Sequence, residues 1–194
     1  MIAILDTGIA NLSSVAFACE RLGRAYVITS DAEQLNKASH VIFPGVGTAK
    51  AFMKGVKENE ILECLKTLTQ PVLGICLGMQ VLYEWSEEGE QNTLGILPGQ
   101  VRRLEADALP VPHMGWNRVL FNVDSLLLKG IEPNSFFYFV HSFVVPDSRK
   151  ISAWTEYGER IPSVVESGSW FGTQFHPERS GEIGQNLLSN FLQL

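Results

Sequence analysis

The sequence predicts an α/β fold, with a central, mostly parallel sheet, flanking helices and a second half that is rich in hairpins. In the first half, short apolar runs alternate with helical patterns, which is typical of parallel strands joined by crossover helices. After about residue 95 the pattern changes to short strand-like runs between glycine and proline turns. The 194 residues, 45% of them hydrophobic, suffice to bury a core without disulfides or metal. We expect one domain over residues 1–194.

Four apolar residues at 2–5 predict the first strand. Asn11 is expected to cap the following helix, and Gly23 to end it. The apolar face of this helix recurs at spacings of three and four: Leu12, Val15, Ala16, Cys19 and Leu22. Residues 26–28 and 40–43 predict two more strands. The second of these ends at the Pro-Gly-Val-Gly turn of residues 44–47, which a central strand does not contain.

A further helical face precedes Pro71, which ends that helix: Ile61, Cys64, Leu65 and Leu68. Residues 72–75 are short and all apolar, as in a strand buried on both faces, and residues 77–85 are expected to be helical. The second half predicts strands at 100–104, 118–121, 135–140, 151–155, 163–165 and 170–175. A last helix at 183–192 has an inward face of Ile183, Leu187, Leu188 and Phe191.

The composition excludes several classes of protein. Fifteen Lys and Arg against 21 Asp and Glu give a net charge of −6, with no basic run, so nucleic acid and anionic membranes are poor partners. The longest apolar runs fall far short of the ~20 residues that span a bilayer, and the first residues reach Asp6 without a Lys or Arg, unlike a signal peptide. Three cysteines without a Cys-x-x-Cys pair fit a reducing cytosol. We expect a cytoplasmic protein without disulfides, metal or cofactor.

Cys76 stands between a predicted buried strand and a predicted helix, in the pentapeptide Gly-Ile-Cys-Leu-Gly at 74–78. This is the pattern of a nucleophile elbow, in which a sharp turn lifts the nucleophile above the carboxyl end of a sheet. Glycines at both ends let substrate and neighbouring backbone approach, and a helix N-terminus favours thiolate over thiol. The alternative is a core cysteine beside incidental glycines. Cys19 and Cys64, each on an apolar helix face, fit that simpler interpretation.

His176 is the best candidate base among four histidines, because an apolar strand ends there in a proline turn. Residues two apart in extended chain share a side, so Glu178 can accept the imidazole N–H and fix its tautomer. Cys76, His176 and Glu178 then form a catalytic triad, and neither Cys76 nor His176 is expected in the core. The alternative is a surface turn with a chance ion pair. His40 is interpreted as structural, whereas His113 and His141 either line a site or are simply packed.

With this elbow and the His-Pro-Glu at 176–178, the chain resembles the class I glutamine amidotransferases, the triad-type glutaminases, over essentially its whole length. Three further motifs make it most similar to the glutaminase subunits that serve histidine biosynthesis. These are the runs 44–47 (Pro-Gly-Val-Gly), 113–117 (His-Met-Gly-Trp-Asn) and 138–143 (Tyr-Phe-Val-His-Ser-Phe). The resemblance implies the class I glutamine amidotransferase fold.

The resemblance also implies a role for each matching residue. Cys76 would attack the side-chain amide of glutamine to give a thioester and ammonia, with His176 as acid and then base and Glu178 orienting it. The Leu77 N–H would be one oxyanion donor and the Gly45-Val46 peptide the second. The amino-acid end of glutamine would be held by Gln80 and Glu88 and by the backbone around His141, Ser142 and Phe143. Many relatives carry Tyr where this chain has Phe143, so any hydroxyl contact there is absent.

The resemblance supplies a partner as well, because the glutaminase fold uses the whole length and leaves no room for an acceptor domain. The implied partner is a separate cyclase subunit with a (β/α)8 barrel, which receives ammonia and forms a heterodimer with this chain. Trp116, Asn117, Tyr138 and Arg179 are expected at that interface and at the ammonia exit. Arg179 has a plainer interpretation as an ordinary surface charge. The Val46 of the second oxyanion donor predicts a hole that is not preformed until the partner acts.

Two other functions stay open at this point. One is a different thiol hydrolase on the same scaffold, such as a γ-glutamyl peptide hydrolase or an amidotransferase of anthranilate or purine synthesis. Such relatives share the triad but not the motif at 113–117. The other is a binding module that has kept the fold without catalysis, which requires a broken triad. Selective alkylation of Cys76 by a glutamine-like electrophile would separate these functions.

Overall fold

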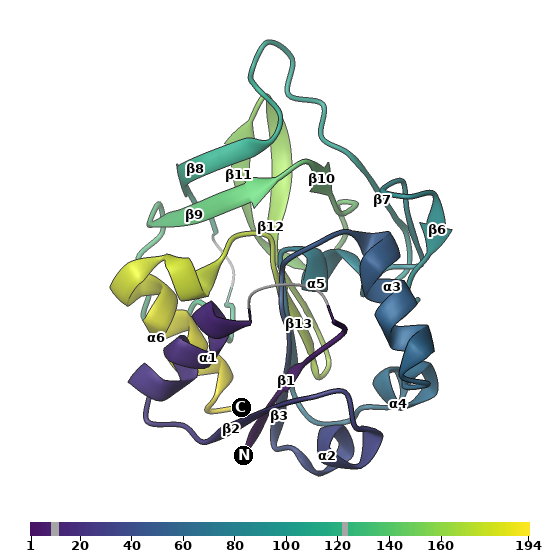
Figure 1. The fold of residues 1–194 in the computed structure, drawn as a ribbon. Coiled ribbons are helices and arrows are strands. Elements are labelled where there is room, and N and C mark those ends of the chain that lie inside the picture. The colour runs from purple at the N-terminus through teal and green to yellow at the C-terminus, as the bar shows by residue number, and fades with distance from the viewer. Residues whose placement is uncertain (9–11, 122–123) are drawn as a thin grey trace.

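The computed structural model describes residues 1–194 apart from 9–11 and 122–123, and in that part of the chain seven strands form the central sheet. Its order is β11-β12-β13-β4-β3-β1-β2 (Figure 1). The pairs of β2, β1, β3, β4 and β13 are parallel, and β12 and β11 extend one edge in antiparallel pairs. The predicted mostly parallel sheet is therefore confirmed. The strands are β1 (Ile2–Leu5), β2 (Tyr26–Thr29), β3 (His40–Phe43), β4 (Val72–Ile75), β11 (Ile151–Tyr157), β12 (Glu159–Ser167) and β13 (Trp170–Thr173).

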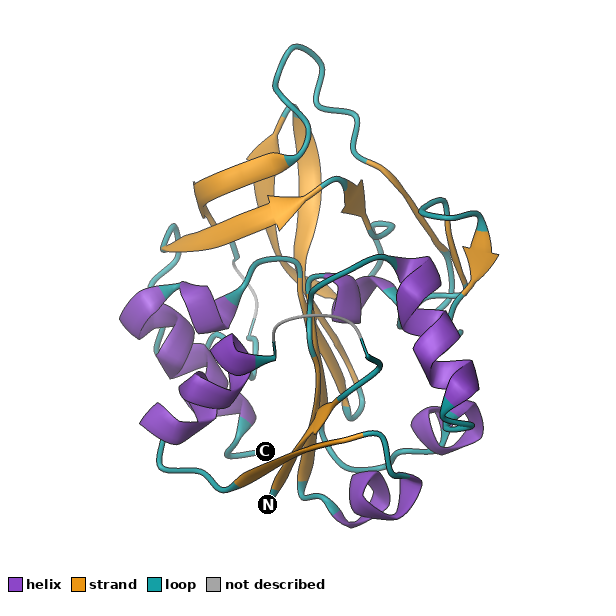
Figure 2. Ribbon diagram, in the orientation of Figure 1, coloured by secondary structure: helices purple, strands orange, loops and turns teal. Residues whose placement is uncertain are grey.

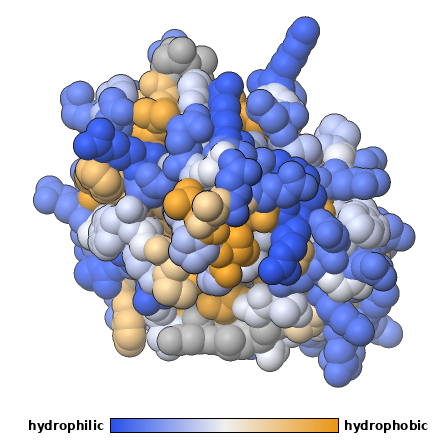
Figure 3. Space-filling model, turned by 90° about the horizontal axis from the view of Figure 1, so that it is seen from above, coloured by the Kyte–Doolittle hydropathy of each residue, from blue (hydrophilic) through white to orange (hydrophobic). Residues whose placement is uncertain are grey.

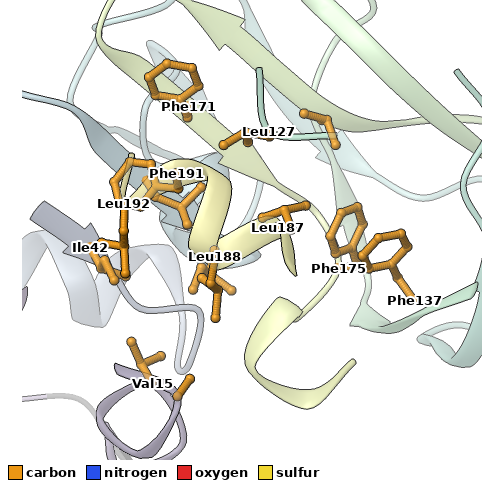
Figure 4. Close-up of a cluster of buried hydrophobic side chains, with 14 of the residues drawn as sticks. Val15, Ile42, Leu127, Phe137, Phe171, Phe175, Leu187, Leu188, Phe191 and Leu192 are labelled. Atoms are coloured by element: carbon orange, nitrogen blue, oxygen red, sulfur yellow. The ribbon is translucent and has the colours of Figure 1, made fainter. Parts of the chain in front are cut away.

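Helices cover both faces of this sheet (Figure 2). One face carries α1 (Ser13–Arg21) and α6 (Gly181–Phe191), and the other carries α2 (Ala32–Lys37), α3 (Ala49–Glu58) and α4 (Leu62–Lys66). Alternate residues of a strand point to opposite faces, so Ile4 and Leu5 pack in different cores. Ile4 belongs to the core on the side of α1 and α6, where Val15 and Leu187 also lie (Figure 4). Both cores are closed to solvent. Side chains that react with a substrate are therefore expected at the ends of the strands.

The second half adds two smaller sheets above the carboxyl ends of the parallel strands (Figure 1). The strands β8 (His113–Arg118) and β9 (Phe136–His141) form an antiparallel pair in which His113 is opposite His141. A four-stranded sheet has the order β10-β7-β5-β6. Its strands are β5 (Trp85–Ser86), β6 (Gln91–Asn92), β7 (Gln100–Arg103) and β10 (Phe143–Val144). The predicted change of architecture near residue 95 is thus confirmed, although these sheets also recruit residues 85–92.

Two predicted elements are wrong. The helix expected at 77–85 ends early, because α5 spans only Leu77–Gln80 and Trp85 belongs to β5. The loop at 94–97 explains this, since its N–H groups bond the carbonyls of residues 81–83 and leave none for a continuing helix. The strand expected at 118–121 lies earlier, as β8, and Leu120 makes only an isolated bridge to Trp154.

Several helix boundaries differ from the sequence pattern. The helix before Pro71 is only α4, and the predicted face residues Ile61 and Leu68 flank it. Helices α2 and α3 were not predicted, although each begins at a side-chain cap. Asn11, the expected cap of α1, lies outside the described residues, whereas the predicted stop at Gly23 adopts φ +65°. The last helix, α6, begins two residues before its prediction. None of the described helices is long and apolar enough to cross a membrane.

Candidate active site

Cys76 occupies a sharp turn between β4 and α5, with φ 50° and ψ −103°. Non-glycine residues rarely adopt this backbone conformation, and it is the strained geometry of a nucleophile elbow. A Cβ added to Gly74 would lie 2.3 Å from the Gly78 carbonyl oxygen, and one added to Gly78 would lie 2.1 Å from that of Phe43. The turn therefore requires both glycines, because the backbone segments they separate are in contact.

His176 follows β13, which pairs in parallel with β4. Because Cys76 follows β4 directly, the two residues lie at the same edge of the sheet. Its Nδ1 lies 2.7 Å from Oε1 of Glu178, as the spacing of two residues predicts. Its backbone N–H donates to the Tyr138 carbonyl at 2.8 Å, which ties it to β9. Burial opposes a charge on this imidazole, but the Cys76 sulfur and the Glu178 carboxylate outweigh burial and raise the His176 pKa to about 10. The protonated ring suits an ion pair with a thiolate.

The expectation that Cys76 and His176 lie outside the core is wrong. The two residues are 6% and 3% exposed, and Cys76 packs in the same apolar core as Ile75. The reason is that β8 and β9 cover the carboxyl ends of the strands, which the chain's local pattern does not show. The Cys76 sulfur is within 3.6 Å of the Val140 carbonyl oxygen of β9. It is also 3.6 Å from Nε2 of Gln174, a residue that the sequence reasoning missed.

A cavity of about 260 Å³ opens in front of Cys76. It gathers most of the residues expected to hold glutamine, from segments that are far apart in sequence: Gly45, Cys76, Leu77, Gln80, Glu88, His141, Ser142 and Phe143. Gly47, Pro112 and Val140 also line it and were not predicted. The cavity therefore joins the turn after β3, the elbow and the end of β9 in one concave site.

The side chains of Gln80 and Glu88 each form a hydrogen bond to the backbone around this cavity. Nε2 of Gln80 donates to the Phe143 carbonyl at 2.9 Å. Oε2 of Glu88 accepts from the Ala49 N–H at 2.7 Å, at the first turn of α3. Both side chains therefore have protein partners on the cavity wall, and a role toward substrate would be additional to these contacts.

His141 and His113 form a directed chain of hydrogen bonds beside the cavity. Nδ1 of His141 lies 2.9 Å from the Phe143 carbonyl, which can only accept, so His141 donates there and its Nε2 is an acceptor. Nδ1 of His113 then donates to it at 3.0 Å, and Nε2 of His113 accepts from the Asn117 amide at 3.2 Å. Burial lowers the pKa of His113 to about 4 and that of His141 to about 3, which keeps both rings neutral.

A second cavity, of about 190 Å³, lies on the other side of the turn after β3. This second cavity is lined by His176, Glu178 and Arg179. Val46 lines it too, and is absent from the lining of the cavity in front of Cys76. Gly45 borders both cavities. The peptide between Gly45 and Val46 consequently stands at the boundary between the nucleophile's cavity and this neighbouring space.

The residues expected at a partner interface lie around the outer face of β8 and β9. Trp116 is 57% exposed and packs edge-on against Tyr138, over whose ring the Arg179 guanidinium lies at 4.8 Å. Met114 and Phe136 add further exposed apolar surface. In Figure 3, which views the molecule from above, apolar side chains gather near the middle of the face shown, among hydrophilic ones. Asn117 differs from the other predicted interface residues, because its amide donates inward to His113 and to the Glu156 carbonyl.

Comparison with known proteins places this site in a family. Residues 3–194 match the model of the family described as "Glutamine amidotransferase class-I". The "Imidazole glycerol phosphate synthase subunit HisH" of Idiomarina loihiensis is 50% identical over 193 residues, which cover 100% of this chain and 97% of the relative. The protein of the same name from Vibrio cholerae is 46% identical over 199 residues, covering 100% and 98%. A solved "glutamine amidotransferase" has the same fold, with a TM-score of 0.76 at 19% identity and coverage of 99% and 97%.

Proposed function

The chain belongs to the class-I glutamine amidotransferase family, and we propose that it is the glutaminase subunit of an imidazole glycerol phosphate synthase. It hydrolyses glutamine to glutamate and ammonia for use in histidine biosynthesis. The observation that carries this proposal is the arrangement in which Cys76 stands on a strained elbow beside His176, whose ring is hydrogen-bonded to Glu178. The cavity in front of the sulfur supplies room for a small amino acid.

In the first step the Cys76 thiolate attacks the side-chain carbonyl carbon of glutamine. The tetrahedral intermediate collapses when protonated His176 gives its proton to the leaving nitrogen, which departs as ammonia and leaves a γ-glutamyl thioester. Neutral His176 then takes a proton from water, whose oxygen attacks the thioester. Glutamate leaves, and the thiolate and the imidazolium are restored. Glu178 holds the ring orientation through Nδ1 in both steps.

The negative oxygen of each intermediate needs donors. The Leu77 N–H follows the nucleophile directly and is the first donor in this proposal. The second is the peptide between Gly45 and Val46, which borders both cavities. If that peptide turns its N–H toward this oxygen only in the active state, the isolated chain is a poor glutaminase, because one missing donor costs ~10²- to 10³-fold in rate.

Glutamine binding is assigned to the remaining walls of the cavity. Gln80 and Glu88 hold the amino-acid end, together with the backbone at His141, Ser142 and Phe143. All five line the cavity around Cys76. Because that end of the substrate changes little during the reaction, these residues are expected to govern KM more than kcat.

The partner is a cyclase subunit, which receives the ammonia and makes imidazole glycerol phosphate and an aminoimidazole carboxamide ribonucleotide. We assign it a (β/α)8 barrel that docks as a heterodimer against Trp116, Asn117, Tyr138 and Arg179. The exposed apolar surface of β8 and β9 supports this assignment. A nucleotide-bound partner that favours the active peptide orientation couples ammonia release to the presence of an acceptor. The complex is placed in the cytoplasm, where three free cysteines are chemically compatible with reducing conditions.

The test is to measure glutamate release from glutamine with and without the purified cyclase subunit and its nucleotide. The parent should be slow alone and fast in the loaded complex, and Cys76→Ala should be inactive in both. Cys64→Ala is the matched control, because that half-buried thiol contacts the Ala32 carbonyl away from the cavity. Equal rates for the parent alone and in the complex would refute the proposed switch. Faster cleavage of γ-glutamyl peptides than of glutamine in the complex would favour a peptide hydrolase instead.

A further inference from the structure

Gln174 lies directly after β13 and is fully buried, at 0% exposure. Its side-chain amide reaches two groups of the candidate active site. Nε2 is 3.6 Å from the Cys76 sulfur, and Oε1 accepts from Nε2 of Gln80 at 3.1 Å. Among the described residues, these are the hydrogen-bond partners of its side chain. Burying an amide is unfavourable unless it is hydrogen-bonded, and both hydrogen bonds of this amide are made to residues of the candidate site.

The orientation of this amide follows from one fixed acceptor. The Phe143 carbonyl can only accept, so the Gln80 atom that lies 2.9 Å from it must be the nitrogen. That same nitrogen lies 3.1 Å from Gln174, so the Gln174 atom facing it must be the oxygen. The remaining atom, which faces the sulfur, is therefore the NH₂ group. The bond to Cys76 is consequently a donated one.

The two contacts of the sulfur favour different protonation states. The Val140 carbonyl oxygen, at 3.6 Å, can bond the sulfur only when the thiol carries its hydrogen. The Gln174 amide donates to either form, and more strongly to the charged one. Loss of the amide donor would therefore leave His176 as the remaining group that favours the thiolate, against the Val140 carbonyl, which favours the unreactive thiol.

We propose that Gln174 is a positioning residue of this reaction. Its amide stabilises the Cys76 thiolate and fixes the direction of the sulfur. Its bond to Gln80 fixes the position of the adjoining cavity wall relative to that sulfur. Gln174 does not touch glutamine in this role. The importance of the residue for glutamine turnover rests on the proposed function, whereas its effect on the thiol does not.

The test measures the rate of Cys76 alkylation by iodoacetamide as a function of pH, in the full chain and without glutamine. Gln174→Met keeps the length of the side chain and removes the donor. We expect the rate at pH 7 to fall about tenfold and the midpoint of the pH profile to move up by about one pH unit, the scale of one lost hydrogen bond to a charged group. Gln174→Glu keeps an acceptor for Gln80 and adds a negative charge beside the sulfur, so its shift should be larger.

Gln70→Met is the matched control, because the Gln70 amide donates to the Leu35 carbonyl at 2.7 Å in a different part of the fold. Its alkylation profile should equal that of the parent. Circular dichroism verifies folding, and mass spectrometry assigns the label to Cys76. Unshifted profiles in both folded Gln174 variants would overturn the proposal, even if their glutamine turnover fell. If the profiles of the Gln174 variants shift but the parent hydrolyses no glutamine with its cyclase, the proposed function is refuted and this role of Gln174 stands.

Discussion

The two sides of the cavity in front of Cys76 are built by different physical means. On the elbow side, backbone presses against backbone, and neither Gly74 nor Gly78 has space for a Cβ. On the opposite side, the end of β9 is held by side-chain hydrogen bonds that run from Asn117 through two neutral histidines to the Phe143 carbonyl. The outer face of the same strands is exposed and apolar.

This difference separates chemistry from recognition. Close packing fixes the nucleophile in one strained conformation, since any alternative would require the strands or α5 to move. The hydrogen-bonded wall depends on protonation states and on groups that reach the exposed face. Changes on the elbow side should therefore abolish turnover or folding, and changes on the other side should be graded and dependent on pH.

The largest effect is expected at the triad, where Cys76→Ala and His176→Ala should lower glutamine turnover by at least about 10⁴-fold. Glu178→Gln should lose less, about 10²- to 10³-fold, because Glu178 orients the ring rather than reacts. Turnover is measured in the loaded complex, with circular dichroism and a pull-down of the cyclase as controls. An unfolded Cys76→Ala would indicate that the buried thiol serves packing.

Gly78→Ala tests the packed side through stability. Its Cβ would meet the Phe43 carbonyl at 2.1 Å, so we expect a loss of about 3 kcal/mol or more in the free energy of unfolding. Gly168→Ala is the matched control, at φ +64° with no neighbour within 4 Å, and should lose only about 1 kcal/mol. Urea unfolding measures both. Equal losses would mean that the elbow tolerates a larger separation from β3 than its packing implies.

The histidine chain should make stability depend on pH. The folded pKa values of about 4 for His113 and about 3 for His141 lie below the ordinary 6.5, so the unfolded chain binds protons that the folded chain does not. Stability from this source is complete above pH 6.5 and declines as the pH falls toward 3, by about 2 kcal/mol for each histidine and about 4 kcal/mol for the pair between pH 7 and 5.

His113→Phe retains an aromatic ring between Phe139 and Tyr157 and removes one of the two titrating groups. Urea unfolding at pH 7 and pH 5 should show a lower stability but a smaller pH dependence than in the parent. A pH dependence unchanged from the parent would contradict the assignment of His113 as a buried neutral donor.

The smallest effect is expected at Glu88. Its removal in Glu88→Ala should raise KM for glutamine about tenfold, with little change in kcat, because the amino-acid end of the substrate changes little in the transition state. The lost bond to the Ala49 N–H should also cost about 1 kcal/mol of stability. Kinetics equal to the parent's would remove Glu88 from the glutamine pocket and leave it a purely structural role.

The parts of the molecule that could be predicted from sequence depend on local patterns. The buried strand at 72–75 and the bond between His176 and Glu178 follow from runs of apolar residues and from a spacing of two. The early end of α5 could not be found this way, because the carbonyls of residues 81–83 that follow it bond to a loop twelve or more residues later in the chain. The same holds for the burial of Cys76 and His176, which depends on strands β8 and β9 closing over them.

Gln174 is an intermediate case. It stands two residues before His176 in the same motif, and a glutamine inside an apolar strand end is a signal that local reading could have used. Its partner Cys76 lies 98 residues earlier, however, so the contact itself is a product of the parallel pairing between β4 and β13. Sequence patterns identified the residues whose side chains can react, and sheet topology determined which of them lie in contact.

The most direct test of the central claim is to trap the covalent intermediate. The loaded complex is mixed with glutamine, quenched in acid within the first turnover, digested and analysed by mass spectrometry. The account predicts a γ-glutamyl group on the peptide that contains Cys76, which disappears as glutamate accumulates and is absent in Cys76→Ala. Glutamine turnover at the parent's rate with no glutamyl group on Cys76, or with that group on another residue, would contradict it.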